Sequence, residues 1–180
     1  MDTTKITHRL ITLLVIGAIT GMIGGAVMAM YTMLATSTYL GMGFFTPLYA
    51  IASPLVGQQV LLTSMHQGHF YFALGPALLG LIIHMMWSAL YGMIFGLIAY
   101  GVHLKGAAAL ISGLVYGVLV MLFMSFIMIP IIGAPNFLHM LGWPSFTFAH
   151  LLFGFVLGLW PVLRAQDFTT LEGQQVRRVA

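Results

Sequence analysis

The chain has 180 residues, of which 61% are hydrophobic and only 5% charged, with a formal net charge of +3 at pH 7. Soluble domains carry about 25% charged residues, so the composition excludes an ordinary water-soluble domain and predicts an integral membrane protein. Cysteine is absent, which excludes disulfides, thiolate metal sites and cysteine nucleophiles. The basic residues lie beside apolar segments, so we expect them to contact the surface of a lipid bilayer and not nucleic acid.

Two long uncharged stretches contain the predicted helices. No Lys, Arg, Asp or Glu occurs between Arg9 and Lys105, or between Lys105 and Arg164. A charge in the bilayer costs at least about 2.5–3.5 kcal/mol, and one crossing takes about 20 apolar residues, so each stretch has room for two crossings. We therefore predict an all-α membrane domain over residues 1–180, with four transmembrane helices at about 10–35, 76–100, 107–132 and 144–163.

The first of these helices follows a basic N-terminus, as a signal peptide would. Its apolar run is longer than a typical signal-peptide core, and no small-residue cleavage site ends it, so we expect the helix to be retained. The segment that follows, about residues 39–70, is too apolar for a solvated loop and too interrupted to span the membrane. Pro47, Pro54 and Gly57 interrupt it, and within residues 44–65 we predict a short interfacial or re-entrant helix, at about 47–62.

The basic residues predict the orientation. All six lie on one side of the predicted bundle: Lys5, Arg9, Lys105, Arg164, Arg177 and Arg178. The loops between helices one and two, and between helices three and four, contain neither Lys nor Arg. The positive-inside rule therefore predicts that both termini are cytoplasmic, in the cytoplasmic membrane, with a polar cytoplasmic tail at residues 165–180.

The two halves of the chain resemble each other. With an offset of 92 residues, Gly21 aligns with Gly113 and Gly25 with Gly117. With an offset of 66 residues, His84 aligns with His150, and further pairs follow at both offsets. Corresponding helices run in the same direction, so we predict two parallel tandem helical-hairpin repeats, at about 10–103 and 104–164, related by a pseudo-two-fold axis along the membrane normal.

Small residues recur every four positions in all four predicted helices. Residues at this spacing share one helix face, and small residues there let helix backbones approach closely in a membrane. These positions are expected to pack the bundle tightly on the cytoplasmic side and to leave more room on the outer side, around the histidines. The predicted packing residues are Gly17, Gly21, Gly25, Gly92, Gly96, Gly113, Gly117, Gly154 and Gly158.

His84 and His150 are predicted to lie within the membrane, roughly 10 Å below the outer ends of their helices at 1.5 Å per residue. An ionisable group at this depth needs a partner and is a functional hypothesis. One interpretation is a neutral imidazole that hydrogen-bonds to a backbone carbonyl, a Ser or a Tyr. A second is axial ligation of haem or a chlorophyll-type pigment. A third is a copper site, another metal site or a proton relay.

Three further histidines, His66, His69 and His139, are predicted in the outer loops and are candidate metal ligands together with the intramembrane pair. The spacing of His66 and His69 suits a helix, although we expect a loop there. The chain also has 14 methionines. Met28, Met30 and Met33, and Met121, Met124 and Met128, recur near helical spacing. Copper binding is one interpretation of this pattern. We expect these residues instead to pack the bundle, because methionine is a flexible apolar filler.

No enzyme constellation is visible in the sequence. The only acids, Asp2, Asp167 and Glu172, lie at the two ends of the chain, so we predict no catalytic residues. We expect a non-catalytic accessory or structural subunit that packs in a larger membrane complex or with itself. The alternatives are a haem- or (bacterio)chlorophyll-binding protein that uses His84 and His150, and a small dimeric transporter or channel.

Three segments carry a resemblance: residues 43–48 (GFFTPL), 84–96 (HMMWSALYGMIFG) and 150–158 (HLLFGFVLG). In these segments the chain resembles small bacterial four-helix integral membrane proteins that remain uncharacterised. The resemblance covers most of the membrane region. It implies a bacterial cytoplasmic-membrane location, and it implies no activity and no functional residue.

Overall fold

The computed structural model describes residues 3–67 and 70–160, and every regular element in them is helical. In chain order the helices are α1 (Thr3–Thr38), α2 (Thr46–Val56), α3 (Gln59–Gln67), α4 (Leu74–Gly101), α5 (Gly106–Phe123), the π-helix η1 (Met124–Met128), α6 (Ile129–Ile132), α7 (Phe137–Leu141) and α8 (Trp143–Gly158).

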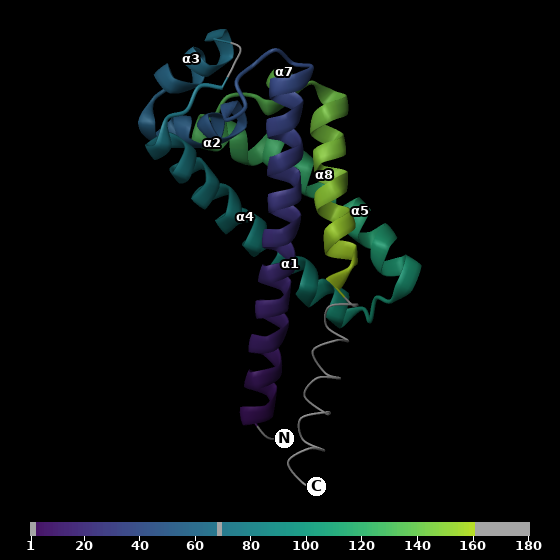
Figure 1. The fold of residues 1–180 in the computed structure, drawn as a ribbon. Helices are drawn as coiled ribbons and strands as arrows, with labels where there is room; N and C mark the ends of the chain where they lie inside the picture. The colour runs from purple at the N-terminus through teal and green to yellow at the C-terminus, as the bar shows by residue number, and fades with distance from the viewer. Residues whose placement is uncertain (1–2, 68–69, 161–180) are drawn as a thin grey trace, which may run out of the picture.

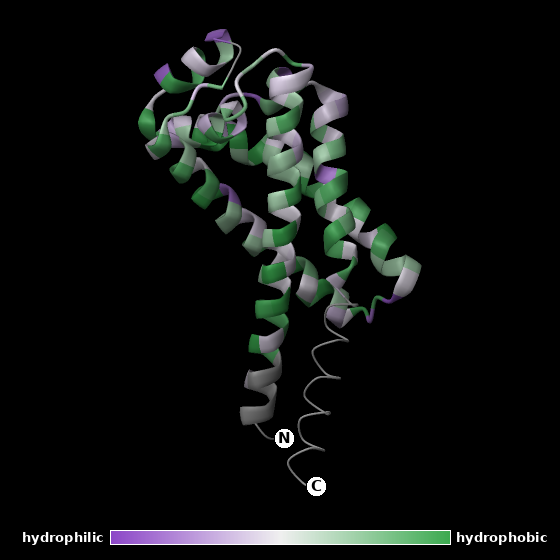
Figure 2. Cartoon of the chain, in the orientation of Figure 1, coloured by the Kyte–Doolittle hydropathy of each residue, from purple (hydrophilic) through white to green (hydrophobic). Residues whose placement is uncertain are grey.

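Three helical segments are long and apolar enough to cross a membrane. They are Leu10–Thr38, Leu74–Gly101 and Gly106–Ile132, the last made of α5, η1 and α6 in succession. Apolar residues cover these helices along their length (Figure 2). The chain is therefore a multi-pass membrane protein. The predicted fourth helix corresponds to α8, which has 16 residues, and its predicted last residues, 161–163, lie outside the described residues, as does the predicted tail at 165–180.

Helix α1 packs against two other helices. Helix α1 contacts both α4 and α8, and α5 packs along α8 (Figure 1). The N-terminal end of α1, the connection from α4 to α5 and the C-terminal end of α8 lie at one end of the bundle, which we call the basal end. Helices α2, α3 and α7 gather at the opposite end, which we call the apical end (Figure 1).

In helix α1 the large apolar side chains lie outside and the small residues lie inside, which is the reverse of a helix in a soluble protein. Large apolar side chains such as Ile11, Val15 and Ile19 are about half exposed and face away from the neighbouring helices. The opposite face is built from glycines and small hydroxyl residues. Thr20 is fully buried there, and its Oγ1 donates to the Ile16 carbonyl oxygen at 2.7 Å. Hydroxyls that bond within their own helix can be buried between helices without an unpaired polar group.

The segment between the first two long helices differs from the single short helix that we predicted. It forms two helices, α2 and α3, which are separated at Gly57, where the backbone φ is +84°. A buried hydrogen bond of 2.8 Å between the Thr46 and Ser64 hydroxyls joins the two helices. The Tyr49 hydroxyl donates to the Tyr71 carbonyl oxygen at 3.0 Å and accepts from the Ala73 N–H at 2.8 Å. These bonds fix the pair of helices against the start of α4.

We predicted one continuous α-helix at about 107–132, but the third long segment is interrupted by the π-helix η1. In η1 the N–H of Ile129 bonds to the Met124 carbonyl, five residues back. The cause is Pro130, which lacks an N–H and whose ring excludes the usual carbonyl four residues earlier. After Gly133, at a φ of +67°, the short helix α7 begins. The Asn136 side chain caps α7 by accepting from the Leu138 N–H at 2.9 Å. Helix α7 was not predicted from the sequence.

Candidate functional site

The site begins where α1 crosses α4. A Cβ atom on Gly21 would meet the Ser88 carbonyl oxygen, and a Cβ on Gly92 would meet the Gly17 carbonyl oxygen. Gly25 lies one turn further toward the apical end, against the Ser88 side chain and close to the His84 ring. The two backbones are thus in direct contact over two turns, and only glycine leaves room for this approach.

Helices α5 and α8 cross in the same manner. A Cβ on Gly113 would meet the Gly154 carbonyl oxygen, and a Cβ on Gly117 would meet the His150 carbonyl oxygen. Gly158 lies against the backbone of Leu110. Each of the nine glycines that the sequence analysis selected lies against another helix. Both histidine-bearing helices are therefore held close to their partners on the basal side of the histidines.

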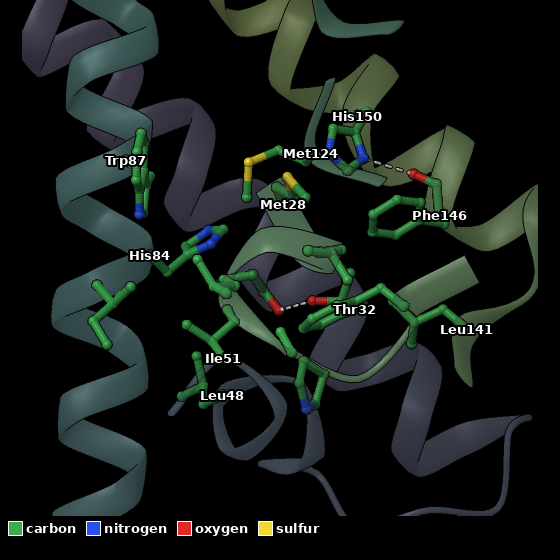
Figure 3. Close-up of a pocket in the computed structure, with 17 residues that line it drawn as sticks. Met28, Thr32, Leu48, Ile51, His84, Trp87, Met124, Leu141, Phe146 and His150 are labelled. Atoms are coloured by element: carbon green, nitrogen blue, oxygen red, sulfur yellow. Dashed lines mark hydrogen bonds between the residues drawn. The ribbon is translucent and has the colours of Figure 1, made fainter. Parts of the chain in front are cut away.

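A cavity of about 110 Å³ lies on the apical side of these crossings. Helix α1 lines it with Met28, Ala29 and Thr32, and α4 lines it with His84 and Trp87. Helices α2, α6, α7 and α8 complete the wall with mostly apolar side chains, and η1 contributes Met124 (Figure 3). The packing changes from glycine against backbone to large side chains at this level, so the helices leave space between them.

His84 reaches the cavity from α4 and is fixed by α1. Its Nε2 lies 2.9 Å from the carbonyl oxygen of Gly25. A carbonyl oxygen only accepts, so Nε2 carries the proton and donates. The apolar lining favours the neutral imidazole, and in that form the other ring nitrogen, Nδ1, is unprotonated and retains a lone pair.

His150 reaches the same cavity from α8 and is 3% exposed. Its Nδ1 lies 2.9 Å from the carbonyl oxygen of Phe146 in the preceding turn, so Nδ1 donates and Nε2 retains the lone pair. The Phe146 ring packs edge-on against the imidazole, with centroids 4.5 Å apart. In Figure 3 the second nitrogen of His150 lies on the side of the ring that faces Met124. Each histidine therefore has the backbone partner of the first interpretation and an unprotonated nitrogen besides.

Two methionines line the cavity together with the histidines. In the view of Figure 3, the Met28 and Met124 side chains lie between those of His84 and His150, and all four line the cavity. The Tyr91 hydroxyl donates to the Met124 sulfur at 3.1 Å, and the Tyr116 hydroxyl donates to the Tyr91 carbonyl oxygen at 3.0 Å. Met124 is also the first residue of η1, and π-helical turns of this kind occur often at functional sites.

Of the three histidines predicted in the outer loops, the structure describes His66 and His139 at the apical end, and neither lines this cavity. His66 is exposed in the last turn of α3. The prediction of a loop at residue 66 was therefore wrong. His139 is exposed in α7, and His69 lies outside the described residues. Within residues 3–67 and 70–160, no three His, Asp or Glu side chains come together as a metal site. A metal site that includes His69 stays a prediction.

Two kinds of site residue were not predicted from the sequence. Gly80 packs against the Leu48 carbonyl oxygen and brings α2 onto α4, which closes the apical side of the cavity. It lies four residues before His84 in the predicted series of small residues, but it was not among the nine selected packing residues. For Met28 and Met124, packing was favoured over copper binding, and no sequence signal separates them from Met33 and Met121, which are 8% and 3% exposed in the core.

The cavity can hold a small neutral molecule or an ion. An engineered apolar cavity of about 150 Å³ binds benzene or xenon, so about 110 Å³ suits an occupant of that size or smaller. The polar atoms available to an occupant include two imidazole nitrogens and the Thr32 hydroxyl oxygen. Comparison of the chain with models of protein families, with curated proteins and with solved structures finds no match.

Proposed function

We propose that the protein crosses the membrane four times, with α8 as the fourth span. At 1.5 Å per residue, the 16 residues of α8 cover about 24 Å of a hydrocarbon core of about 30 Å. The predicted continuation to residue 163 supplies the difference. The basal end holds the start of α1 and the turn with Lys105 (Figure 1), which supports a cytoplasmic basal end and cytoplasmic termini under the positive-inside rule.

The two hairpins are, in this proposal, parallel repeats. Gly21 and Gly113 are equivalent under the offset of 92, and Ser88 and Gly154 are equivalent under the offset of 66. Gly21 meets the carbonyl of Ser88, and Gly113 meets the carbonyl of Gly154. Chance similarity between apolar segments does not explain why equivalent glycines meet equivalent backbone groups, so this agreement supports a duplication.

The function that the geometry supports best is that of a non-catalytic membrane subunit that holds a small ligand between its two hairpins. The cavity carries this proposal, because each hairpin contributes one histidine to it and each histidine keeps an unprotonated nitrogen. The described residues that line the cavity include no carboxylate to act as a general acid or base. The broad apolar surface of the long helices fits a subunit that contacts lipid and either a second copy or other subunits of a larger complex in the bacterial cytoplasmic membrane.

A tetrapyrrole is the less favoured occupant. Pockets for drug-sized ligands measure about 300–1,000 Å³, whereas this cavity measures about 110 Å³. In addition, Nε2 of His84 donates a hydrogen bond to the Gly25 carbonyl oxygen. Axial ligation of a haem or pigment by that atom would break this hydrogen bond between α1 and α4. For a dimeric transporter or channel, a polar path through the bundle is needed. The buried Thr20 and Ser125 hydroxyls instead bond to their own helices.

Native mass spectrometry of the protein, gently purified from its own membrane, tests the ligand and the assembly together. We expect an added mass on the wild-type chain that is absent from Ala29→Leu, which fills the cavity from the buried Ala29. The matched control is Ala26→Leu, at an exposed position of the same helix, and it should keep the added mass. The same spectra report whether the chain is a homo-oligomer or part of a larger complex. An unliganded wild-type protein, or an adduct that Ala29→Leu retains, would contradict the proposal.

A further inference from the structure

Four side chains with an imidazole nitrogen or a thioether sulfur line the cavity, one from each of the three long helical segments and one from α8. Met28 comes from α1, His84 from α4, Met124 from η1 at the end of α5, and His150 from α8. In the view of Figure 3 the two sulfurs lie between the two imidazole rings. Two imidazoles and two thioethers thus face one small space, which is the number of ligands that a tetrahedral metal centre takes.

Both imidazoles are already oriented as metal ligands are. A ligating histidine almost always donates its second ring N–H to a carboxylate, a backbone carbonyl or water, which fixes the tautomer and the orientation of the ring. Here His84 donates to the Gly25 carbonyl and His150 to the Phe146 carbonyl, both at 2.9 Å. Each bond leaves the remaining nitrogen with the lone pair that coordination needs.

The thioethers select the metal. Methionine sulfur is a soft ligand that favours Cu(I), whereas carboxylate and carbonyl oxygens suit Mg²⁺, Ca²⁺ and Mn²⁺. Met124 is oriented by the Tyr91 hydroxyl at 3.1 Å, and its sulfur has a second lone pair. Met28 and Met124 line the cavity, whereas Met33 and Met121 are buried in the core of the bundle.

The charge of the site points to the same metal. All four donors are neutral, and the described lining contains no Asp or Glu, so a bound ion keeps its full charge. The Born cost of burying an ion grows with the square of its charge, so a divalent ion costs about four times as much as a monovalent one. We propose that the cavity binds one Cu(I) ion through Met28, Met124, His84 and His150. This inference rests on the proposed function of the cavity as a ligand site.

The test measures Cu(I) binding to the full chain in detergent, without oxygen, by competition with a chromophoric Cu(I) chelator. All proteins in this test carry His66→Asn, His69→Asn and His139→Asn, which remove the three histidines predicted in the outer loops as competing ligands. We expect one Cu(I) per chain, with both nitrogen and sulfur neighbours in the copper X-ray absorption spectrum. The double variant Met28→Leu/Met124→Leu should lose the sulfur neighbours and at least about tenfold in affinity, because even changes to groups that only orient the ligands cost that much.

Matched controls distinguish a specific site from unspecific Cu(I) binding by other methionines of the chain. Met30 and Met86 are 53% and 61% exposed on α1 and α4, and Met30→Leu/Met86→Leu should leave both readouts unchanged. The exchange of Met for Leu conserves volume and usually costs less than about 1.5 kcal/mol, so the variants are expected to fold. His150→Phe should remove a nitrogen neighbour in the same assay.

The outcomes distinguish this inference from the proposed function. Three outcomes would overturn the copper site. They are equal affinity for Cu(I) in the wild type and in Met28→Leu/Met124→Leu, an absorption spectrum without sulfur neighbours, and copper binding that is lost when His66, His69 and His139 alone are replaced. If the protein binds no Cu(I) but carries an organic adduct that Ala29→Leu removes, the copper site is wrong and the ligand-binding function stands. If neither copper nor an adduct binds, both proposals are wrong.

Discussion

The contact of Gly21 with α4 offers a direct test of the packing argument through Gly21→Ala. The added Cβ would meet the Ser88 carbonyl oxygen and would lie 2.9 Å from the Gly92 Cα. Carbon atoms in optimal contact are about 3.5–4.0 Å apart. Both obstacles are backbone atoms, so no side-chain rotation relieves the contact, and α1 and α4 must separate by about 1 Å.

The size of the effect follows from two opposing contributions. Overpacking a tight interface costs typically about 1–3 kcal/mol, and we expect the upper end of this range because both partners are backbone. Alanine is better than glycine inside a helix by about 1 kcal/mol. The net loss in the free energy of unfolding is therefore about 2 kcal/mol, which lowers the ratio of folded to unfolded protein roughly 30-fold.

Unfolding by SDS in mixed micelles, followed by circular dichroism, measures this loss. The matched control is Gly75→Ala in the first turn of α4, where an added Cβ meets nothing within 4 Å, and its stability should stay the same or rise by up to about 1 kcal/mol. Equal stability of Gly21→Ala and Gly75→Ala would refute the argument that this glycine is required for the approach of α1 to α4.

Three further predictions test the repeat, the topology and the apical end. Gly113→Ala should cost about as much as Gly21→Ala, or about 2 kcal/mol, in the same unfolding assay, and an unchanged stability would contradict equivalent crossings. Because the chain lacks cysteine, single cysteines at Lys105 and Gln58 can be labelled with an impermeant maleimide in spheroplasts. Only Gln58→Cys should react before lysis, and the reverse pattern would contradict the orientation. Burial raises the pKa of Tyr49, so its hydroxyl stays protonated. Tyr49→Phe should therefore lower the free energy of unfolding by about 1–3 kcal/mol, because it leaves the Ala73 N–H without that acceptor. A loss no larger than that of Tyr39→Phe would contradict this role of the Tyr49 hydroxyl.

The sequence predicted the long helices well because lipid imposes a simple constraint. A span must be uncharged and about 20 residues long, and the position of Lys105 between two uncharged stretches is enough to separate the central helices. The packing faces were also accessible, because glycine every four residues has few explanations in an apolar helix other than a close crossing. Gly21 and Gly113 are found at such crossings.

The apical end could not be predicted in the same way. The break at Gly57 between α2 and α3, the π-helical turn before Pro130 and the short helix α7 each depend on tertiary contacts. Composition indicated only that the first connection was too apolar for solvent. The Thr46–Ser64 bond that joins α2 to α3 links residues 18 positions apart, and neither residue carries a local signal for it.

The cavity was predictable in its depth but not in its lining. Helical spacing placed His84 and His150 at equivalent levels, on the apical side of the glycine crossings. When every face of a helix is apolar, however, hydrophobic periodicity does not separate the face toward lipid from the face toward a cavity. Met28 and Met124 were for this reason not distinguishable from methionines in the core, and only their position in three dimensions makes them candidate ligands.

The position of the cavity follows from the geometry of the crossings. Two straight helices that cross in close contact at one level diverge above and below it, so side chains must fill the widening gap. On the basal side Leu13, Phe95 and Trp160 do so and are 3% exposed or less. On the apical side the gap meets His84 and His150, each held back against a backbone carbonyl by its hydrogen bond. A ring fixed in this way cannot move to fill the space, so the same two bonds that make the histidines available as ligands also keep the cavity open.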